Sequence, residues 1–327
     1  MDNAVGPGAS GHDQAQNGDS PRPLERGRNP VQSPFRGHVP SDRMVILGSG
    51  GARIVVAKQL RASGGIWLSL AGTRFLVDPG PGSLVRMTGS RHRLEPTKLT
   101  GILLSHRHLD HSGDVNNMIE AMTMGGTEPR GMLFAPSDAL EGDDPVVLKY
   151  VRTFLARVVT LKEGGSYELG TVRFSCPVRH EHRGEVYGFR FEVPGLTVAC
   201  ITDTRYFPEL AEHYRADVVI MNVVRPKSSD LDHLSAPDAE ELVKAIRPRL
   251  AVLNHFGMRM IAAKPWLLAR EMSERTGCRV VAASDGMLVD LEPYKASSRE
   301  PQAVSTDEEM LWGQSPCGDS PPSGGAE

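Results

Sequence analysis

The sequence lacks long apolar runs, and its N-terminus lacks the basic-then-apolar order of a secretory signal. We therefore expect a cytoplasmic protein without a membrane-spanning segment. Cysteine is also scarce, with four widely spaced residues that form neither a zinc-ribbon pair nor a disulfide-dense pattern. We interpret Cys176, Cys200 and Cys278 as small buried hydrophobic side chains, and Cys317 as part of a C-terminal tail.

A strong excess of charge of either sign is absent as well. The formal net charge of the 327 residues is −3, and most of it comes from the acidic C-terminal region, so the remaining chain is close to neutral. A nucleic-acid-binding domain usually carries a clustered basic face. The composition therefore predicts no strong nucleic-acid footprint.

Large apolar side chains are scarce at both ends of the chain. Residues 1–43 and 294–327 are rich in Gly, Pro, Ser and charged residues, so we expect both to be disordered tails. The apolar cluster Met310-Leu311-Trp312 is either part of a flexible tail or a docking peptide. Residues 44–293 have ordinary apolar content and the size of one layered α/β domain.

A histidine-rich stretch, Ser105-His106-Arg107-His108-Leu109-Asp110-His111, follows the apolar run Gly101-Ile102-Leu103-Leu104. Imidazole and carboxylate groups are the usual ligands of zinc and its first-row neighbours. In an extended loop His106 and His108 point the same way, while Asp110 and His111 can face a second ion. The stretch predicts a site for two ions about 3.5–4 Å apart. A polar surface loop is the alternative.

Around this stretch the pattern changes from a β-meander to alternating strands and helices. We expect strands at 44–47, 54–56, 66–70, 73–77, 131–135, 172–176, 187–192, 196–201, 217–221, 250–253, 280–283 and 287–291. We expect helices at 115–122, 148–155, 208–214, 235–246 and 265–275. Ser235 is the expected N-cap of its helix, with Asp238 three positions on.

Two turns next to these strands each allow two interpretations. Gly48-Ser49-Gly50-Gly51 is either a plain hairpin or bulge turn, or a place where the backbone approaches a ligand. Asp78, before Pro79, is either a turn aspartate or an acceptor that orients a metal-binding histidine from outside the ligand set. Neither choice follows from the local sequence alone.

Polar residues of ligand type follow five of the expected strands: Asp78, the histidine-rich stretch, His182, Asp203 and His255. Together they resemble a metallo-β-lactamase-fold hydrolase, whose motif is His-x-His-x-Asp-His. The resemblance covers residues 44–291. It implies an α/β fold, a four-layer αββα sandwich.

The resemblance also implies a ligand set. His106, His108 and His182 would hold one divalent ion, Asp110, His111 and His255 the other, and Asp203 would bridge them, with Asp78 as a supporting residue. His182 is preferred to His180 because it stands six residues before Gly188-Phe189, the family's spacing. Zinc is the expected metal, with manganese or iron as alternatives.

His233 resembles the histidine that ribonuclease Z and cyclic phosphodiesterases use to protonate the leaving oxygen. The implied function is phosphodiester hydrolysis by a hydroxide shared between the two ions, with Asp110 and His233 as catalytic residues. The 21 positions between His182 and Asp203 are too few for the tRNA-gripping arm of ribonuclease Z. We therefore expect a small or unstructured phosphodiester substrate.

Three other functions remain open: hydrolysis of esters, thioesters or lactams, a ribonuclease Z-like nuclease, and a non-catalytic metal-bound sensor. Arg205, Arg225 and Lys227 are either phosphate-holding cations or solvated surface charges. The sequence leaves the oligomeric state open, a homodimer included.

Overall fold

The computed structural model describes residues 41–296. Almost all of the two expected tails, with Cys317 and the cluster Met310-Leu311-Trp312, therefore lies outside the described residues. Within residues 41–296, none of the helices has the length and apolar character that crossing a bilayer requires.

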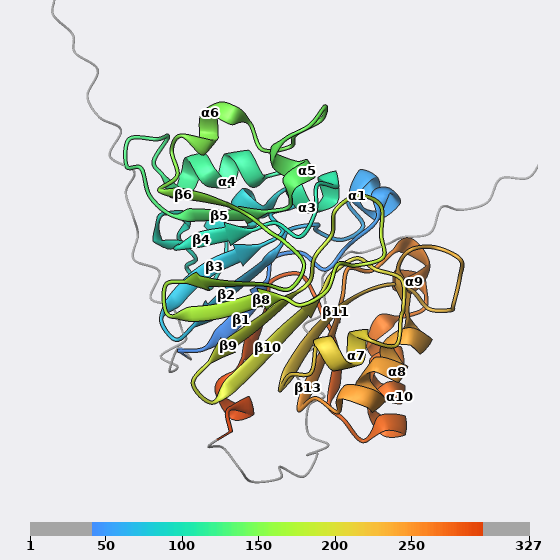
Figure 1. Cartoon of the computed structure of the whole chain (residues 1–327). Helices are drawn as coiled ribbons and strands as arrows, with labels where there is room; N and C mark the ends of the chain where they lie inside the picture. Colours follow the sequence, from blue (N-terminus) through green and yellow to red (C-terminus); the bar gives the residue numbers. More distant parts are fainter. Residues whose placement is uncertain (1–40, 297–327) are drawn as a thin grey trace, which may run out of the picture. The chain divides into compact units, whose positions relative to one another are not determined.

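Two large sheets form the centre of the described chain (Figure 1). The first has seven strands in the order β15 (Met287–Asp290), β1 (Arg43–Ile46), β2 (Ile66–Leu70), β3 (Thr73–Val77), β4 (Gly101–Leu103), β5 (Met132–Ala135) and β6 (Arg157–Thr160). Strands from β15 to β3 pair antiparallel, which confirms the expected meander at 66–77, and strands from β3 to β6 pair parallel.

The second sheet has the order β14 (Val280–Ala282), β13 (Leu250–Asn254), β11 (Val218–Arg225), β10 (Leu196–Ile201), β9 (Phe189–Val193), β8 (Val172–Cys176) and β7 (Gly165–Leu169), with β12 (Leu234–Ser235) paired to β11. Strands from β7 to β10 pair antiparallel, and β10, β11, β13 and β14 pair parallel. Both sheets are therefore mixed.

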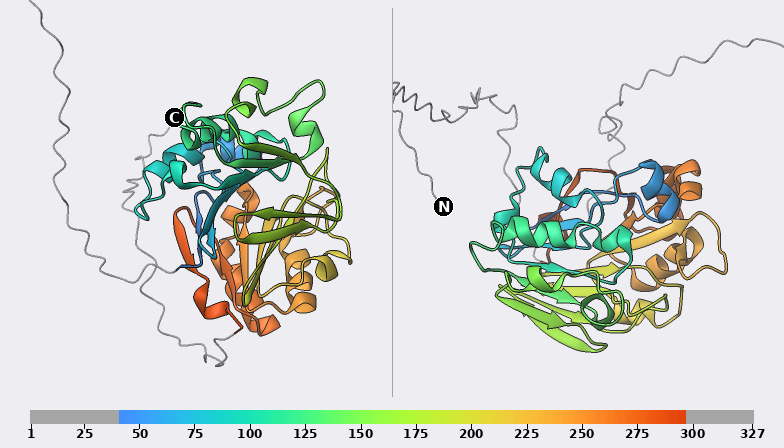
Figure 2. Two further views of the ribbon diagram at one scale, coloured as in Figure 1. Left: turned by 60° about the vertical axis from the view of Figure 1, so that its left-hand side comes forward. Right: turned by 90° about the horizontal axis from the view of Figure 1, so that it is seen from above.

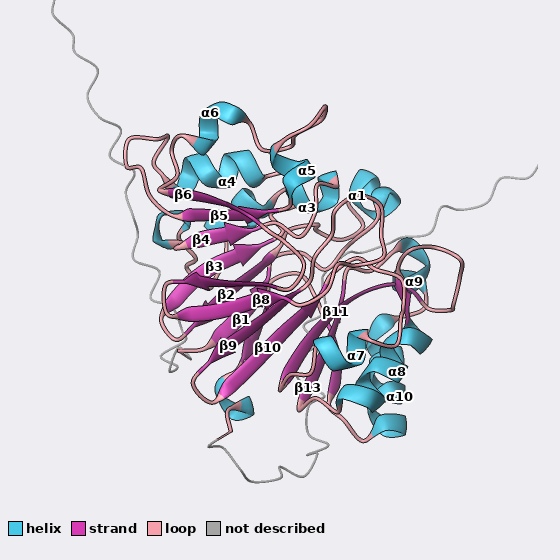
Figure 3. Cartoon of the chain, in the orientation of Figure 1, coloured by secondary structure: helices cyan, strands magenta, loops and turns pink. Residues whose placement is uncertain are grey.

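Helices cover the outer faces of both sheets (Figures 2 and 3). The first sheet carries α2 (Ser83–Thr88), α4 (Val115–Met122), α5 (Ser137–Leu140) and α6 (Lys149–Arg152), and the second carries α7 (Leu210–His213), α8 (Ala236–Ile246) and α10 (Pro265–Thr276). The order of layers is helix, sheet, sheet, helix, as expected for the metallo-β-lactamase fold.

Strand alternation explains this layering. On β3, Phe75 and Val77 pack into the core between the two sheets, whereas Leu76 faces the outer core beneath α4, because successive side chains point to opposite faces. On α4, Val115, Met118, Ile119 and Met122 are buried at helical spacing. Cys176, Cys200 and Cys278 are buried and free, which confirms their interpretation.

Three sequence predictions of secondary structure are wrong or incomplete. Residues 54–56 are not a strand but lie in the short helix α1 (Arg53–Lys58), where only Val55 is buried. The expected helix at 148–155 is a single turn at Lys149–Arg152, followed by strand β6, which the sequence did not predict. Strand β7 was also missed, because edge strands with exposed faces such as β6 and β7 carry a weak apolar alternation.

The remaining elements are short and lie in the connections between the strands. They are α3 (Leu109–Ser112), α9 (Met258–Ala262) and two 3₁₀ turns, η1 (Pro96–Lys98) and η2 (Glu292–Tyr294). Ser235 and Asp238 form the expected reciprocal cap at the start of α8.

Candidate metal centre

The candidate ligands all lie on connections that follow the strands. Asp78 follows β3, the histidine-rich stretch follows β4, Asp203 follows β10 and His255 follows β13. His182 lies on the connection between β8 and β9, and His233 lies before β12. Because neighbouring parallel strands end at the same edge of a sheet, ligands far apart in sequence converge there.

The first group of donors contains His106, His108 and His182. The Nε2 atom of His106 lies 3.0 Å from Nδ1 of His108, and Nε2 of His182 lies 3.2 Å from the same Nδ1. Two ligands that are each 2.0–2.1 Å from a tetrahedral ion are separated by about 3.3 Å. The three imidazoles are therefore spaced like ligands of one ion.

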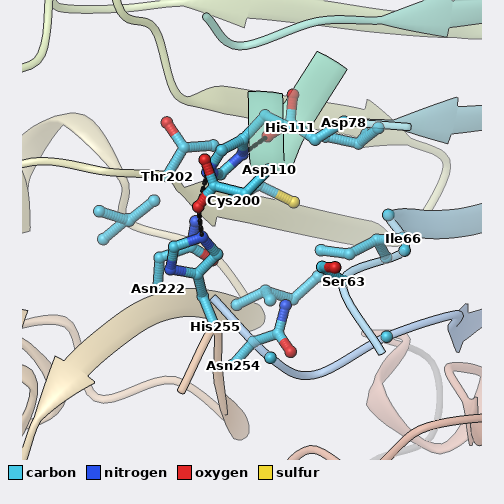
Figure 4. Close-up of a pocket in the computed structure, with 17 residues that line it drawn as sticks. Ser63, Ile66, Asp78, Asp110, His111, Cys200, Thr202, Asn222, Asn254 and His255 are labelled. Atoms are coloured by element: carbon cyan, nitrogen blue, oxygen red, sulfur yellow. Dashed lines mark hydrogen bonds and ion pairs between the residues drawn. The ribbon is translucent and has the colours of Figure 1, made fainter. Parts of the chain in front are cut away.

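The second group contains Asp110, His111 and His255. Oδ2 of Asp110 lies 3.4 Å from Nε2 of His255 and 3.9 Å from Nε2 of His111. Figure 4 shows these three side chains pointing toward one another. They come from two connections, one after β4 and one after β13.

Asp203 lies between the two groups. Its Oδ2 atom is 3.3 Å from Nε2 of His111 and 4.0 Å from Nε2 of His106. Its other oxygen, Oδ1, accepts a hydrogen bond from Nδ2 of the buried Asn222 on β11 at 2.9 Å. One carboxylate thus adjoins both donor groups while its second oxygen is held by the sheet.

Polar contacts outside the ligand set orient the imidazoles. Asp78 Oδ2 lies 2.9 Å from Nδ1 of His111, and the same carboxylate accepts hydrogen bonds from the backbone N–H and hydroxyl of Ser105 at 2.7 Å each. Nδ1 of His182 donates to the carbonyl of Asp232 at 2.8 Å. Such contacts fix the ring and direct the other nitrogen toward a metal. Of the two interpretations of Asp78, contact with a candidate ligand is the one observed.

Sequence reasoning missed Ser105 and Asn222 as supporting residues. Ser105 stands next to the histidine motif, so its position was a usable signal. Asn222 lies inside a continuous apolar strand, and one buried asparagine in such a strand needs a hydrogen-bond partner. That requirement was the only signal in the sequence.

The glycine loop before α1 packs directly against His255. A Cβ atom added at Gly51 would lie 2.1 Å from Nδ1 of His255, which is too close for any side chain. The loop is also joined to the second donor group, because the backbone N–H of Ala52 donates to Oδ2 of Asp110 at 3.2 Å. Of the two interpretations of Gly48–Gly51, close approach of the backbone to a candidate ligand is the one observed.

Two of the candidate residues have unusual backbone conformations. Asp78 and His255 have φ angles of 52° and 61°, in the left-handed region that residues with a side chain rarely adopt. Such strain costs of the order of 1–3 kcal/mol and often occurs at functional sites. At both positions the conformation accompanies a side chain that lies in the cluster.

His180 does not join the donor groups. It is buried, with Nε2 2.8 Å from the hydroxyl of Tyr214 and Nδ1 3.2 Å from the hydroxyl of Thr202. Burial lowers the pKa of its imidazole to about 3. His180 is therefore a neutral, hydrogen-bonded residue of the interior, and the geometry favours His182 as the candidate ligand.

The first donor group is electrostatically suited to a cation. Burial lowers the pKa of His106 well below its ordinary value, and the neighbouring His111 lowers it further. Burial also lowers the pKa values of His108 and His182. Neutral imidazole is the form that coordinates a metal, so these three residues are held in the competent state.

Burial and nearby carboxylates act in opposite directions on the pKa of His111 in the second donor group. Burial disfavours a charged His111, but Asp203, Asp110 and Asp78 outweigh burial and raise its pKa well above the ordinary value. For Asp203, burial favours the neutral acid, but His255 and His111 outweigh burial and hold the pKa well below its usual range. The group therefore concentrates negative charge in a buried place, which is where a divalent cation is stabilised.

His233 lies at the edge of the cluster. Its Nε2 atom is 3.3 Å from Oδ2 of Asp203, and its ring centroid is 4.7 Å from that of His182. The side chain is 21% exposed, whereas the carboxylate of Asp203 is buried. It thus combines contact with the cluster and access from solvent.

A small cavity of about 30 Å³ lies beneath the second donor group. Its polar lining includes Ser63, Asn222 and Asn254, and Figure 4 shows these side chains below Asp110 and around His255. This volume is water-sized, so the cavity is too small for a substrate. Chemistry on a substrate must take place on the exposed side of the cluster, where His108, His182 and His233 are partly exposed.

The donor set fits divalent metal ions. Nε2 of His111 and both ring nitrogens of His255 are buried and have no hydrogen-bond partner in the described chain, although each lies 3.3–3.5 Å from a carboxylate oxygen. Buried polar atoms without partners are costly, and metal coordination would satisfy them. Nitrogen and carboxylate donors suit zinc, manganese and iron.

Comparison with known proteins agrees with this geometry. Residues 73–256 match the family model described as "Beta-lactamase superfamily domain". The chain belongs to the beta-lactamase superfamily. The match spans both donor groups and His233.

Individual members of the superfamily are similar over most of the described chain. An uncharacterized protein of Methanocaldococcus jannaschii is 31% identical over 257 residues, which cover 76% of this chain and 94% of that protein. Ribonuclease Z of Kineococcus radiotolerans is 26% identical, covering 78% of this chain and 96% of the enzyme. The metallo-beta-lactamase fold protein YhfI from Bacillus subtilis has the same fold, with 16% identity, a TM-score of 0.63, and coverage of 77% and 99%.

Superfamily membership and the His/Asp clusters make the protein a metallohydrolase of the metallo-β-lactamase fold. The fold and the family were thus predicted correctly from the sequence. The same family uses divalent metals, in agreement with the donor set described above.

Proposed function

We propose that this protein is a dinuclear metal-dependent phosphodiesterase in which His233 is the general acid. The position of His233 is the observation that carries the proposal. It lies 3.3 Å from Asp203, the carboxylate between the two donor groups, and is partly exposed on the side from which a substrate can arrive. Hydrolysis of a phosphodiester with a poor leaving group needs a proton donor at this place.

In this proposal His106, His108 and His182 hold one ion, and Asp110, His111 and His255 hold the other. Asp203 bridges them, and Asp78 orients His111. The distances within each donor group support the assignment. Zinc is the proposed metal, with manganese or iron as alternatives.

The chemistry that two bound divalent ions supply is a lower pKa for coordinated water, from 15.7 toward about 7, and neutralisation of charge on phosphate oxygens. The chain itself supplies the proton. Nε2 of His233 faces the cluster, 3.3 Å from Oδ2 of Asp203. In the proposed role, this nitrogen gives a proton to the leaving oxygen.

A ribonuclease Z-like nuclease is the second candidate, because a relative of that name is 26% identical over most of both chains. The connection from His182 to Asp203 weighs against it, since this segment consists of a loop and the hairpin β9–β10, without an inserted arm. Hydrolysis of esters, thioesters or lactams would use the same donor groups without a need for His233. A metal-bound sensor would leave the proton donor unused.

The test is a substrate panel on protein loaded with two ions. It compares a bis-aryl phosphodiester, a cyclic phosphodiester, a thioester and a lactam, each with the wild type and His233→Ala. We expect turnover of phosphodiesters above that of acyl substrates. Loss of His233 should lower kcat by about 100-fold or more for an alkyl leaving group and far less for p-nitrophenolate, which leaves without a proton.

The control variant is His213→Ala, because His213 lies on α7 and outside the donor groups. Metal content should be unchanged in both variants. Higher turnover of the thioester or the lactam would contradict the phosphodiesterase assignment. Loss of one ion in His233→Ala would instead make His233 a ligand, a role that its closeness to His182 and Asp203 also permits.

A further inference from the structure

Large apolar side chains are exposed around the candidate metal centre. Leu109 is 71% exposed, although it stands between two candidate ligands in the sequence. Four more such residues lie within three positions of a cluster residue or of the glycine loop. We call the five together the apolar rim: Ile54, Leu109, Tyr206, Leu231 and Met258.

The rim residues belong to the connections that carry the donor groups. Leu109 begins α3, Ile54 lies on α1 beside the glycine loop, and Met258 begins α9 after His255. The backbone N–H of Ala52 donates to Asp110, so α1 is joined directly to the cluster. These side chains therefore stand on the segments that hold the donor groups.

An ion pair joins the two connections that carry the other two rim residues, Tyr206 and Leu231. Arg205 donates to the carboxylate of Asp232, with Nε 3.1 Å from Oδ1. Tyr206 and Leu231 are the immediate sequence neighbours of these two residues, and His233 follows Asp232. Each of the two joined connections thus carries an exposed apolar side chain, and one of them also carries the proposed proton donor.

Two arginines on the connections that carry the donor groups are already paired with carboxylates. Arg205 is paired with Asp232 and also lies 3.7 Å from a carboxylate oxygen of Glu181. Arg107, within the histidine motif, lies 3.6 Å from a carboxylate oxygen of Asp138. A nucleic-acid backbone is bound by cations that can release its counterions. These two arginines are not available for that role.

We propose that the apolar rim selects small phosphodiesters that carry a large apolar or aromatic ester group. This inference rests on the proposed phosphodiesterase function. In the reaction the oxygen of water bonds to phosphorus and the P–O bond to one alcohol breaks. The alcohol takes a proton from His233, and the proton that water loses is released to solvent, from which His233 is protonated again. The apolar ester group packs on Leu109, Tyr206 and Leu231, which removes its surface from water.

The test is a series of p-nitrophenyl phosphodiesters in which only the second ester group changes, from methyl to butyl to benzyl. The leaving group is constant, so differences in kcat/KM report binding of the second group. We expect kcat/KM to rise about tenfold from methyl to benzyl in the wild type, since burial of each methylene is favourable. It should change less than twofold between low and moderate salt.

Leu109→Ser and Leu231→Ser should reduce the ratio of benzyl to methyl kcat/KM to between one and three. Both variants should keep the circular dichroism spectrum and the metal content of the wild type, which a misfolded variant would not show. The matched control is Met124→Ser, because Met124 is 54% exposed but lies past the far end of α4. This control should keep the wild-type ratio.

Several results would overturn the inference. They are a ratio near one in the wild type, a faster and strongly salt-dependent turnover of single-stranded RNA, or a change of oligomeric state in Leu109→Ser with an unchanged ratio. The last result would make the rim a protein interface. Hydrolysis of none of the series by protein with two bound ions would contradict the proposed function itself, which is a distinguishable outcome.

Discussion

The substitution Gly51→Ala tests how closely the backbone packs against the candidate metal centre, because it adds one methyl group beside His255. The φ angle of Gly51 is not in the left-handed region, so Gly51→Ala adds no backbone strain of that kind. The new Cβ would lie 2.1 Å from Nδ1 of His255, whereas an ordinary contact is at least 3.4 Å. Either the imidazole or the loop must therefore move by about 1.3 Å, the difference between these two distances.

A misplacement of about 1 Å at a reacting group can cost 100-fold in rate. Disturbed support of a ligand typically costs about 10- to 100-fold in metal affinity. We expect Gly51→Ala to bind the second ion about 10- to 100-fold more weakly and to lose activity by a similar or larger factor. The first donor group does not contact Gly51, so one ion should bind as in the wild type.

The assay is a metal titration by calorimetry on apo-protein, with circular dichroism as a check on folding. The control is Gly72→Ala, in the turn between β2 and β3, where an added Cβ meets nothing within 4 Å although φ is +81°. That variant should lose some stability and keep both ions. Binding of two ions by Gly51→Ala with wild-type affinity would refute the reasoning.

Three further changes test other parts of the account. Asn222→Leu removes the hydrogen-bond donor to Asp203, so metal affinity should fall about 10- to 100-fold in titrations. Unchanged affinity would contradict a supporting role of Asn222. Chelation should lower Tm by about 10–20 °C, since each of the two ions adds about 2.7 kcal/mol when present at 100 Kd. Lys295 and Ser41 lower the pKa of Glu292 to about 2. Glu292→Gln should therefore lower the free energy of unfolding above pH 4.5. In denaturant titrations the difference between variant and wild type should vanish toward pH 2.

The last of these predictions also concerns the limits of the domain. Glu292 accepts hydrogen bonds from the backbone N–H of Asp42, and Leu291 donates to the carbonyl of Asp42. We propose that residues 44–293 form one folding unit, whose C-terminal end is tied to Asp42 just before its first residue. An equal stability of Glu292→Gln and the wild type at neutral pH would contradict a structural role for this tie.

The sequence predicted the candidate site better than the elements around it. A dense motif such as His106 to His111 has few structural explanations, and ligands at strand ends converge because neighbouring parallel strands end together. The choice of His182 over His180 relied on spacing alone. Geometry now supports that choice, because His180 is used by Tyr214.

The errors arose where tertiary contacts outweigh local preference. Ile54, Val55 and Val56 are β-branched and favour a strand, yet they form a helical turn because the glycine loop must pass His255 before the chain reverses. The short strands β6 and β7 lie at sheet edges and carry few buried side chains. Neither feature leaves a periodic signal that the sequence alone can show.

Support for the ligands was harder to predict for a similar reason. Asn222 and Asp203 are 19 positions apart, and their hydrogen bond exists only because β10 and β11 are neighbours in the second sheet. The apolar rim likewise consists of single residues on separate connections. Such pairings depend on the register of the sheet, which is a property of the folded chain.

Hydrolysis of a bis-aryl phosphodiester, followed while divalent metal is added to apo-protein, tests the central proposal most directly. We expect activity to be low with one ion per chain and to rise to a maximum at two. Asp203→Ala should abolish this rise, because Asp203 adjoins both donor groups. Full activity with one ion, or no phosphodiester hydrolysis with two ions bound, would contradict the proposed dinuclear phosphodiesterase.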